Sequence, residues 1–179
     1  MNLYTHGNLT VRLLAETDAS LLADWLSDPL VLTYYEGRDR PHDAEMVKQS
    51  FFDGDESNTR CIVQYDGQDI GYIQFYAITD EERIEYGYGD FTGSIFGMDQ
   101  FIGETSFWNQ GIGTELVITM VRYLRSHKGA DKIVMDPQAW NERALRVYEK
   151  AGFVKKKYLP EHEWHEGEYR DCWIIEYEV

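Results

Sequence analysis

The sequence predicts a mixed α/β fold, in which antiparallel hairpins come first, a parallel β–α–β unit follows, and helices pack against one sheet. Apolar residues over 59–65 and 70–78 flank Asp66-Gly67, a pattern typical of a β-hairpin with a tight turn. Further on, a strand over 94–102, a helical stretch and a short strand over 131–135 form the β–α–β succession. A chain of 179 residues with 43% hydrophobic residues can bury a core around such a sheet.

Composition indicates one ordered domain over residues 1–179. Four prolines and 15% aromatic residues are typical of a globular chain. No apolar run approaches the length of a membrane span, and the first residues lack the basic-then-apolar pattern of a secretory signal. We therefore expect a cytoplasmic protein without a membrane partner, in which Cys61 and Cys172 are buried free thiols.

The first half of the chain predicts five further features in order. Residues 9–14 form a strand, and a helix begins at Thr17, with leucines and a tryptophan on one face. Residues 34–38 form a loop rich in aromatic and charged side chains, and a second helix covers about 43–52. After the hairpin, Asp80-Glu81-Glu82 predicts an acidic loop.

The second half predicts a helix over 141–151, closed by Gly152 as a left-handed cap. Strands over 153–158 and 172–178 complete the sheet, and residues 161–166 form a polar loop between them. The two histidines of that loop are three residues apart and lack a third ligand, so we expect no metal site.

Two glycines lie where the strand over 94–102 has ended and a helical period begins, in the segment Gln110-Gly111-Ile112-Gly113-Thr114. Glycine allows a tight turn that brings backbone N–H groups close to a ligand. The following helix adds unpaired N–H groups and the positive end of its dipole. This turn predicts a phosphate or pyrophosphate cradle, although many such turns only connect elements.

A second set of residues shares one face of the helix over 141–151. Asn141, Ala144 and Tyr148 are spaced i, i+3 and i+7, which places a hydrogen-bonding group, a small residue and a phenol side by side. Together with the strand and the glycine turn, this face indicates a cofactor cleft. The alternative for Tyr148 is ordinary packing with a satisfied hydroxyl.

The charge balance restricts the class of partner. The chain has 17 Lys and Arg against 32 Asp and Glu, a formal net charge of −15. This charge argues against nucleic acid as a partner, because a phosphate backbone requires a basic surface. A cationic small molecule fits this charge, and a solvated acidic surface that serves solubility is the alternative.

These segments resemble a known family. Gln110-Gly111-Ile112-Gly113-Thr114 and residues 141–153, with their asparagine, alanine, tyrosine and Ala-Gly-Phe ending, look like the acetyl-CoA signature of GNAT N-acetyltransferases. More narrowly, Gly97-Met98-Asp99-Gln100, Asp136-Pro137 and residues 159–163 resemble aminoglycoside 6′-N-acetyltransferases. The resemblance implies the GNAT fold, a mostly antiparallel central sheet splayed at its middle strands with helices on both faces.

The resemblance also implies that a substrate amine attacks the acetyl thioester directly. Asp99 is the expected base, since it is a carboxylate in a strand row that otherwise holds Ile95, Gly97 and Phe101. Its spacing alone is equally consistent with a structural ion pair. Tyr148 would protonate or hydrogen-bond the departing thiolate of coenzyme A.

The expected site residues follow from the same resemblance. Acetyl-CoA, the co-substrate, would be bound by Gln100, Phe101, Ile102, Gln110, Gly111, Ile112, Gly113, Thr114, Asn141, Ala144, Tyr148 and Lys150. The substrate would be bound by Tyr34, Tyr35, Glu36, Tyr76, Asp80, Asp99 and Asp136, each of which alone could be a solvated residue. One position departs from the superfamily, because Trp108 stands three residues before the first glycine, where Gln or Arg is usual.

The resulting hypothesis is an enzyme that acetylates the 6′-amine of kanamycin-like or tobramycin-like aminoglycosides and so confers resistance, as a monomer or weak homodimer. Two alternatives stay open. One is a GNAT enzyme that acts on a peptide N-terminus or a polyamine, and the other is a non-catalytic acetyl-CoA-binding module. Asp99 argues against the second, because such a module needs no carboxylate beside the acetyl group.

Overall fold

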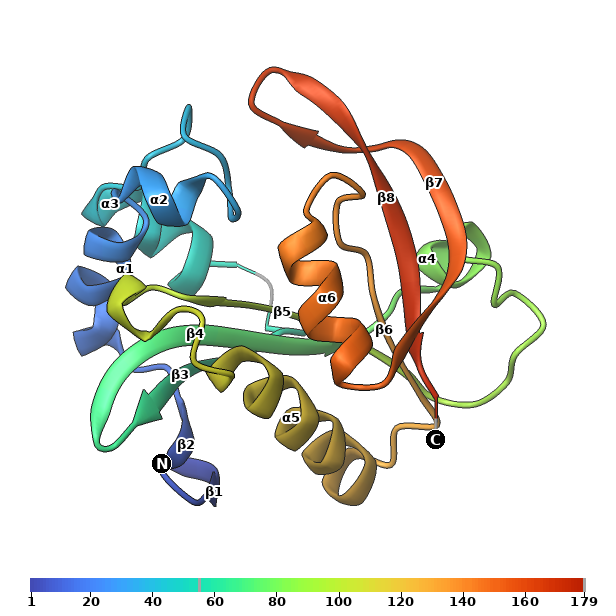
Figure 1. Ribbon diagram of the computed structural model, residues 1–179, viewed down its shortest axis with the longest axis horizontal. Coiled ribbons are helices and arrows are strands. Elements are labelled where there is room, and N and C mark those ends of the chain that lie inside the picture. Colours follow the sequence, from blue (N-terminus) through green and yellow to red (C-terminus); the bar gives the residue numbers. More distant parts are fainter. Residues whose placement is uncertain (55, 179) are drawn as a thin grey trace. The chain divides into compact units, whose positions relative to one another are not determined.

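A computed structural model describes residues 1–54 and 56–178 of the chain. Among these residues the strands form one sheet in the order β1-β2-β3-β4-β5-β6-β8-β7 (Figure 1). The strands are β1 (Asn2–His6), β2 (Leu9–Leu13), β3 (Thr59–Tyr65), β4 (Gln68–Ala77), β5 (Ile95–Ile102), β6 (Lys132–Met135), β7 (Phe153–His165) and β8 (Glu168–Tyr177). Pairing is antiparallel for β1–β2, β2–β3, β6–β8 and β7–β8, whereas β5 and β6 are parallel, which confirms the mixed sheet.

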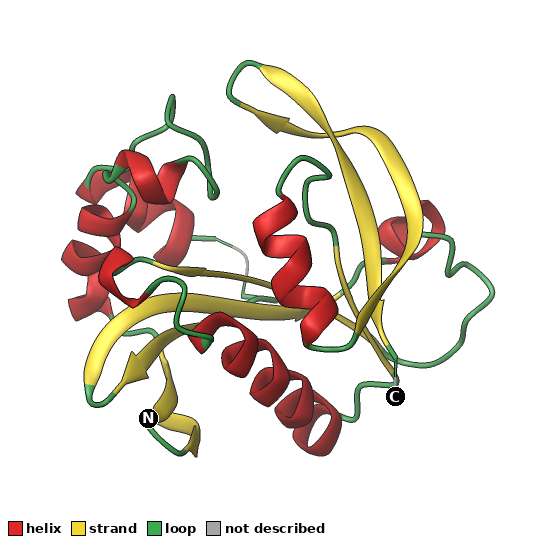
Figure 2. Ribbon diagram, in the orientation of Figure 1, coloured by secondary structure: helices red, strands yellow, loops and turns green. Residues whose placement is uncertain are grey.

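The helices connect these strands (Figure 2). They are α1 (Ala19–Trp25), α2 (Pro29–Leu32), α3 (Ala44–Val47), α4 (Asp80–Glu85), α5 (Ile112–Lys128) and α6 (Glu142–Lys150), with short 3₁₀ turns at Glu16–Asp18 and Thr105–Phe107 and a π turn at Lys48–Phe52. In residues 1–54 and 56–178 no helix has both the length and the apolarity to cross a membrane.

The described chain groups into two compact units. The first, called the N-terminal unit, contains residues 1–74 and 100–112 apart from residue 55, and the second, called the C-terminal unit, contains residues 75–99 and 113–178. The boundary falls within β4, β5 and α5, so these elements contribute residues to both units. That the whole chain acts as one domain stays a prediction.

The N-terminal unit is built around aromatic packing. The Trp25 ring meets Phe101 edge to face at 6.1 Å, and Phe101 stacks on Tyr72 at 5.6 Å between ring centroids. Gly103 lies so close to Trp25 that an added Cβ would fall 2.3 Å from the indole ring. The aliphatic residues of this core come from α1 and the residue after it, α2, α3 and β3, namely Leu22, Leu26, Val31, Leu32, Val47 and Ile62.

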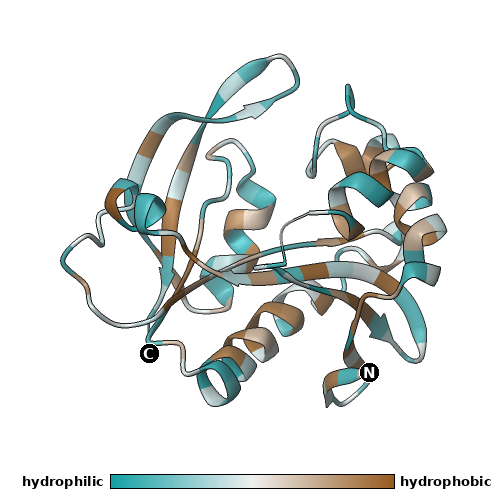
Figure 3. Cartoon of the chain, turned by 180° about the vertical axis from the view of Figure 1, so that it is seen from behind, coloured by the Kyte–Doolittle hydropathy of each residue, from teal (hydrophilic) through white to brown (hydrophobic). Residues whose placement is uncertain are grey.

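The C-terminal unit has its own apolar core. Figure 3 shows hydrophobic and hydrophilic residues alternating along α5, as expected for a helix with one buried face. Met120, Val121 and Leu124 lie on that face and are at most 1% exposed. A second cluster joins Ile95 of β5 to Ile174 of β8.

The prediction of two buried free thiols is confirmed, and burial raises the pKa of Cys61 to about 12.

Most elements agree with the sequence predictions. The short helix α2 (Pro29–Leu32) was not expected, and three further differences occur. The expected acidic loop at Asp80-Glu81-Glu82 is wrong, because these residues begin α4. The Thr79 hydroxyl accepts from the Glu82 N–H at 3.1 Å, and the Glu82 carboxylate accepts from the Thr79 N–H at 3.0 Å. This reciprocal capping satisfies two backbone donors and starts a helix.

The other two differences concern strands. The strand β1 (Asn2–His6) was not expected, and the polar loop expected over 161–166 is wrong. Strand β7 continues to His165 and turns at Glu166-Gly167 into β8, which gives a long hairpin drawn in red in Figure 1. Continuous backbone pairing with β8, from Glu163 opposite Arg170 to His165 opposite Glu168, holds this polar segment as a strand.

Candidate active site

The glycine turn leads directly into α5. Gly111 has a φ of +79°, a conformation that residues with a Cβ seldom adopt, and α5 begins at the next residue. In the N-terminal unit, the Gln110 side chain donates to the Ser106 carbonyl at 2.7 Å and so closes the loop before the turn. In the C-terminal unit, a Cβ on Gly113 would lie 3.8 Å from Val147, so the first turn of α5 faces α6. This helix start has the backbone donors that an anion needs.

Trp108, which precedes the glycine turn, is fixed by contacts with β5 and with Tyr34. Its indole N–H donates to the carbonyl of Ile102, the last residue of β5, at 2.8 Å. Its ring lies edge to face against Tyr34, with 5.9 Å between the centroids. The residue that departs from the superfamily pattern therefore ties the loop after β5 to the strand end.

The expected substrate residues of the N-terminal unit differ in exposure. The Tyr34 side chain is 41% exposed, whereas the Tyr35 ring packs on Phe101 at 4.5 Å and is held by the core. Glu36 has a positive φ of 68° and lies 4.0 Å from the Arg40 guanidinium. Of the two tyrosines, Tyr34 has the more exposed ring.

Helix α6 carries the second expected set. The Asn141 side chain accepts from the Ala144 N–H at 3.2 Å, so its oxygen caps the helix. Tyr148 is half-buried, with its ring 6.4 Å from Phe153. Lys150 is the exposed last residue of the helix, and Gly152 follows with a φ of +108°, which confirms the predicted cap. Ala144 and Tyr148 thus lie on α6, whereas Asn141 precedes the helix as its cap, so the face expected to hold all three residues contains only two of them.

A group of acids and a phenol is brought together in the C-terminal unit. The Tyr76 ring covers Gly97 of β5 so closely that a Cβ there would fall 2.6 Å from the ring. Burial raises the pKa of Tyr76 well above its ordinary value, and the negative charges of Asp99 and Asp136 raise it further. The Tyr76 hydroxyl therefore remains protonated, a neutral donor near two carboxylates.

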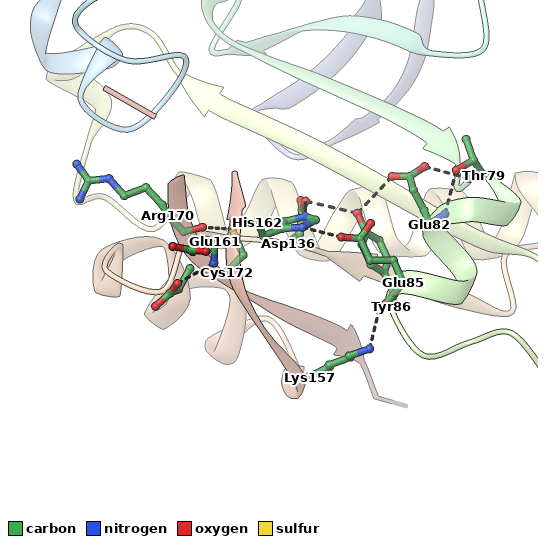
Figure 4. A network of polar contacts seen from close by, with 11 residues as sticks. Thr79, Glu82, Glu85, Tyr86, Asp136, Lys157, Glu161, His162, Arg170 and Cys172 are labelled. Carbon is green, nitrogen blue, oxygen red and sulfur yellow. Dashed lines mark hydrogen bonds and ion pairs between the residues drawn. The ribbon is translucent and has the colours of Figure 1, made fainter. Parts of the chain in front are cut away.

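Asp136 follows β6 and is surrounded by residues that the sequence did not indicate (Figure 4). Its carboxylate accepts from the Tyr86 hydroxyl at 3.4 Å and lies 3.1 Å from Nε2 of His162. The single hydrogen of the Tyr86 hydroxyl is shared with the Glu82 carboxylate, which lies 3.2 Å from the phenol oxygen. Asp80, in the first turn of the same helix α4, is exposed. The described geometry thus brings Tyr76, Asp99 and Asp136 into one electrostatic neighbourhood and adds Tyr86, Glu82 and His162.

Comparison with known proteins identifies the family. Residues 15–160 match the acetyltransferase (GNAT) domain. The aminoglycoside N(6′)-acetyltransferase type 1 of Klebsiella pneumoniae is 32% identical over 161 residues, which cover 85% of this chain and 77% of that protein.

Solved structures agree in fold. The structure of AAC(6′)-Ib in complex with ribostamycin and coenzyme A matches with a TM-score of 0.77 at 28% identity, covering 95% of this chain and 93% of that one. The same enzyme with coenzyme A and kanamycin matches with a TM-score of 0.75 at 27% identity, covering 94% and 93%. With the glycine turn, the α6 face and these matches together, the chain belongs to the GNAT acetyltransferase family and is an acyltransferase.

Proposed function

We propose that this chain transfers the acetyl group of acetyl-CoA to the 6′-amine of aminoglycoside antibiotics and so confers resistance to kanamycin-like drugs. The observation that carries the proposal is the 32% identity with an aminoglycoside N(6′)-acetyltransferase over 85% of the chain. The net charge of −15 supports it, because an acidic protein attracts a polycation from solution.

Asp99 is the proposed general base. An aminoglycoside amine is mostly an ammonium at neutral pH, so it must lose a proton before its nitrogen can attack the thioester carbon. A positioned base accelerates such a step by about 10²–10⁴. Asp99 is half-buried on β5, in the row that includes Gly97 and the Tyr76 ring above it. The carboxylate holds the ammonium, then takes its proton directly or through a water molecule.

The remaining steps use a backbone donor and a phenol. The N–H near Gln100 on β5 would donate to the thioester oxygen as negative charge develops there, and such a donor lowers a barrier by roughly 2.7–4 kcal/mol. The Tyr148 hydroxyl would protonate or hydrogen-bond the departing thiolate. Because a thiolate leaves readily, we assign this second role a smaller share of the rate.

Coenzyme A would be held by the glycine turn and by residues at the end of β5 and on or beside α6. The turn of Gln110, Gly111, Ile112, Gly113 and Thr114 would bind the pyrophosphate through backbone N–H groups and the start of α5. Phe101, Ile102, Asn141, Ala144 and Lys150 complete the proposed set.

The aminoglycoside would be recognised by carboxylates and aromatic rings. Asp136, with its carboxylate 28% exposed, would bind an amine other than the reacting one. Tyr34, Tyr35 and Tyr76 would contact sugar rings, and Glu36 and Asp80 would add negative charge. Exposed ion pairs contribute only about 0.2–1 kcal/mol each, so recognition depends on several of them acting together.

A substrate panel tests the proposal. Release of free coenzyme A thiol is measured with acetyl-CoA and kanamycin, tobramycin, spermidine, a peptide with a free N-terminus, and an aminoglycoside that carries a hydroxyl at the 6′ position. We expect turnover with the first two compounds and little with the others. Preference for spermidine or the peptide would replace this proposal with one of those activities, and binding of acetyl-CoA without any turnover would indicate a non-catalytic module.

A further inference from the structure

His162 lies between two carboxylates that come from different elements. Its Nδ1 is 2.9 Å from the Glu85 carboxylate on α4, and its Nε2 is 3.1 Å from the Asp136 carboxylate after β6 (Figure 4). The imidazole itself is on β7 and only 13% exposed. Both ring nitrogens therefore contact acceptors in a largely buried position.

A bulge in β7 accompanies this placement. Leu159 pairs with Cys172 and Glu163 pairs with Arg170, so three residues of β7 lie opposite the single residue Asp171. Glu161 takes a positive φ of 49°, and its N–H donates to the Asp171 carboxylate at 2.9 Å. Bulges redirect side chains and are fixed by such contacts, so the position of His162 is built into the hairpin.

The two contacts require a particular protonation state. A neutral imidazole has one N–H and one acceptor nitrogen, whereas an imidazolium has two N–H groups. Two carboxylates can both be satisfied only by the imidazolium. In agreement, the pKa of His162 is raised above its ordinary value, first by the hydrogen bond to Asp136 and further by the charges of Asp136 and Glu85, against an opposing effect of burial.

Among residues 1–54 and 56–178, the other groups that contact His162 or Asp136 are neutral or acidic. The Tyr86 ring meets the imidazole edge to face at 6.1 Å, and burial raises the pKa of Tyr86, which keeps its hydroxyl neutral. Glu82 receives a hydrogen bond from Tyr86, and the Lys157 ammonium donates to the Glu85 carbonyl at 2.7 Å. Tyr76 and the buried Cys172 are further neutral groups, because burial raises the pKa of each and nearby negative charges, Asp136 among them, raise it further.

We propose that His162 is a resident cation on the Asp136 carboxylate, and that binding of a cationic substrate amine at Asp136 expels the His162 proton to solvent. The inference rests on the proposed function, in which Asp136 binds an aminoglycoside amine. With His162 protonated, the three groups Asp136, Glu85 and His162 carry a net charge of −1, and with it neutral they carry −2. A cation is bound more tightly by the second state, so affinity rises as pH rises through the His162 pKa.

The same geometry makes His162 a positioning residue. A neutral His162 can donate to only one carboxylate, so one of Asp136 and Glu85 then regains free acceptor oxygens. Substrate binding and deprotonation are linked, and each shifts the other by the same free energy. The protonation state of His162 thereby determines the affinity of the Asp136 carboxylate for an ammonium group at a given pH.

The direct test follows the His162 ring by NMR. Ring ¹H–¹⁵N spectra are titrated with pH in the free protein and with saturating kanamycin, and the His162 signals are identified by their loss in His162→Gln. We expect kanamycin to lower the His162 pKa by about 0.7 or more, the effect of one unit charge about 4 Å away in water. We expect Asp136→Asn to lower it in the free protein as well. A His162 pKa that does not change when kanamycin saturates the protein would overturn the proposal.

Steady-state kinetics give a second readout. The KM for kanamycin is measured from pH 6 to pH 9 for the wild type and for His162→Gln, whose amide does not titrate in this range. The titration of the drug's own amines is common to both proteins and cancels in the ratio. We expect the wild-type KM to be at least about 5-fold higher than that of the variant at pH 6, and the two to converge at high pH. A ratio independent of pH would also contradict the proposal.

Different results would refute the proposed function and the role of His162. If the wild type acetylates no aminoglycoside at any pH, the proposed function itself is wrong. If the wild type acetylates kanamycin but kanamycin does not change the His162 pKa, only the proposed role of His162 is wrong. Glu85→Gln is the matched variant, because it removes the carboxylate at the other ring nitrogen and leaves Asp136 in place. It should lower the His162 pKa in the free protein without abolishing the response to kanamycin.

Discussion

Gly97 determines where the Tyr76 ring can lie. A Cβ at this position would be 2.6 Å from the ring, far inside van der Waals contact. We predict that Gly97→Ala displaces Tyr76 and lowers the free energy of unfolding by about 1–3 kcal/mol, as overpacking commonly does. The KM for kanamycin should rise with it. Gly89→Ala is the control, because its Cβ would meet Ile84 at an ordinary 3.9 Å. Equal stability of the two variants in urea unfolding would refute the steric argument.

Asp99 is the proposed general base of the reaction. We predict that Asp99→Asn folds and binds acetyl-CoA normally but turns over kanamycin at least about 100-fold more slowly, because the amide cannot accept the proton. Calorimetric binding of acetyl-CoA and the measured kcat together check this prediction. Asp90→Asn removes one carboxylate from an exposed position of the same unit and should leave kcat unchanged. Turnover retained in Asp99→Asn would remove Asp99 from the role of base.

Single residues were predictable where local pattern sufficed. Asp99 could be selected as a candidate because it is the one carboxylate in an apolar strand row, and alternation in a strand is a local property; its role as base stays a prediction. His162 could not be paired with Asp136, since the contact joins residues 26 positions apart through a bulge. The Trp108 indole likewise bonds a backbone carbonyl, which no residue pattern identifies.

Helix α4 contributes Glu82, which accepts from Tyr86, and Glu85, which contacts His162. Its capping pair, Thr79 with Glu82, fixes the start of a helix that carries Glu85 and leads into Tyr86. We predict that Thr79→Ala lowers the free energy of unfolding by about 1 kcal/mol, the usual cost of a lost cap, and raises the KM for kanamycin. Thr79→Ser keeps the hydroxyl and should stay close to the wild type. Identical thermal unfolding of the alanine and serine variants would show that the cap does not matter.

The same helix shows what sequence reading can recover. Thr79-Asp80-Glu81-Glu82 has the Ser/Thr-x-x-Glu pattern of a capping box, so a helix start was detectable there even though charge density favoured a loop. Strands β7 and β8 are a different case. Residues 161–165 lack apolar alternation, and backbone pairing with the adjoining strand β8 makes them a strand.

At the scale of the whole molecule, the net charge of −15 should act on both substrates. Raising salt shortens the screening length from about 10 Å at 0.1 M to about 3 Å at 1 M. We predict that the KM for kanamycin, a polycation, rises about 3-fold or more over this range. The KM for acetyl-CoA, an anion, should stay level or fall. Parallel changes in the two KM values would point to a general salt effect in place of electrostatic attraction.

The succession of hairpins followed by a β–α–β unit was predictable for the whole chain, because turn residues and apolar periodicity act locally. The strand order places β8 between β6 and β7, which depends on the return of the last hairpin and could not be derived from local pattern. Family membership then agreed with the motif residues, since the matched region of 15–160 includes the glycine turn and α6.

The central claim is that acetyl transfer is directed to one amine of the drug. The most direct measurement is the NMR spectrum of the product formed from kanamycin and acetyl-CoA. The account predicts a single acetyl group on the 6′-nitrogen. Acetylation of any other amine of kanamycin would contradict it. So would unmodified kanamycin after incubation with enzyme that transfers acetyl groups to another amine substrate.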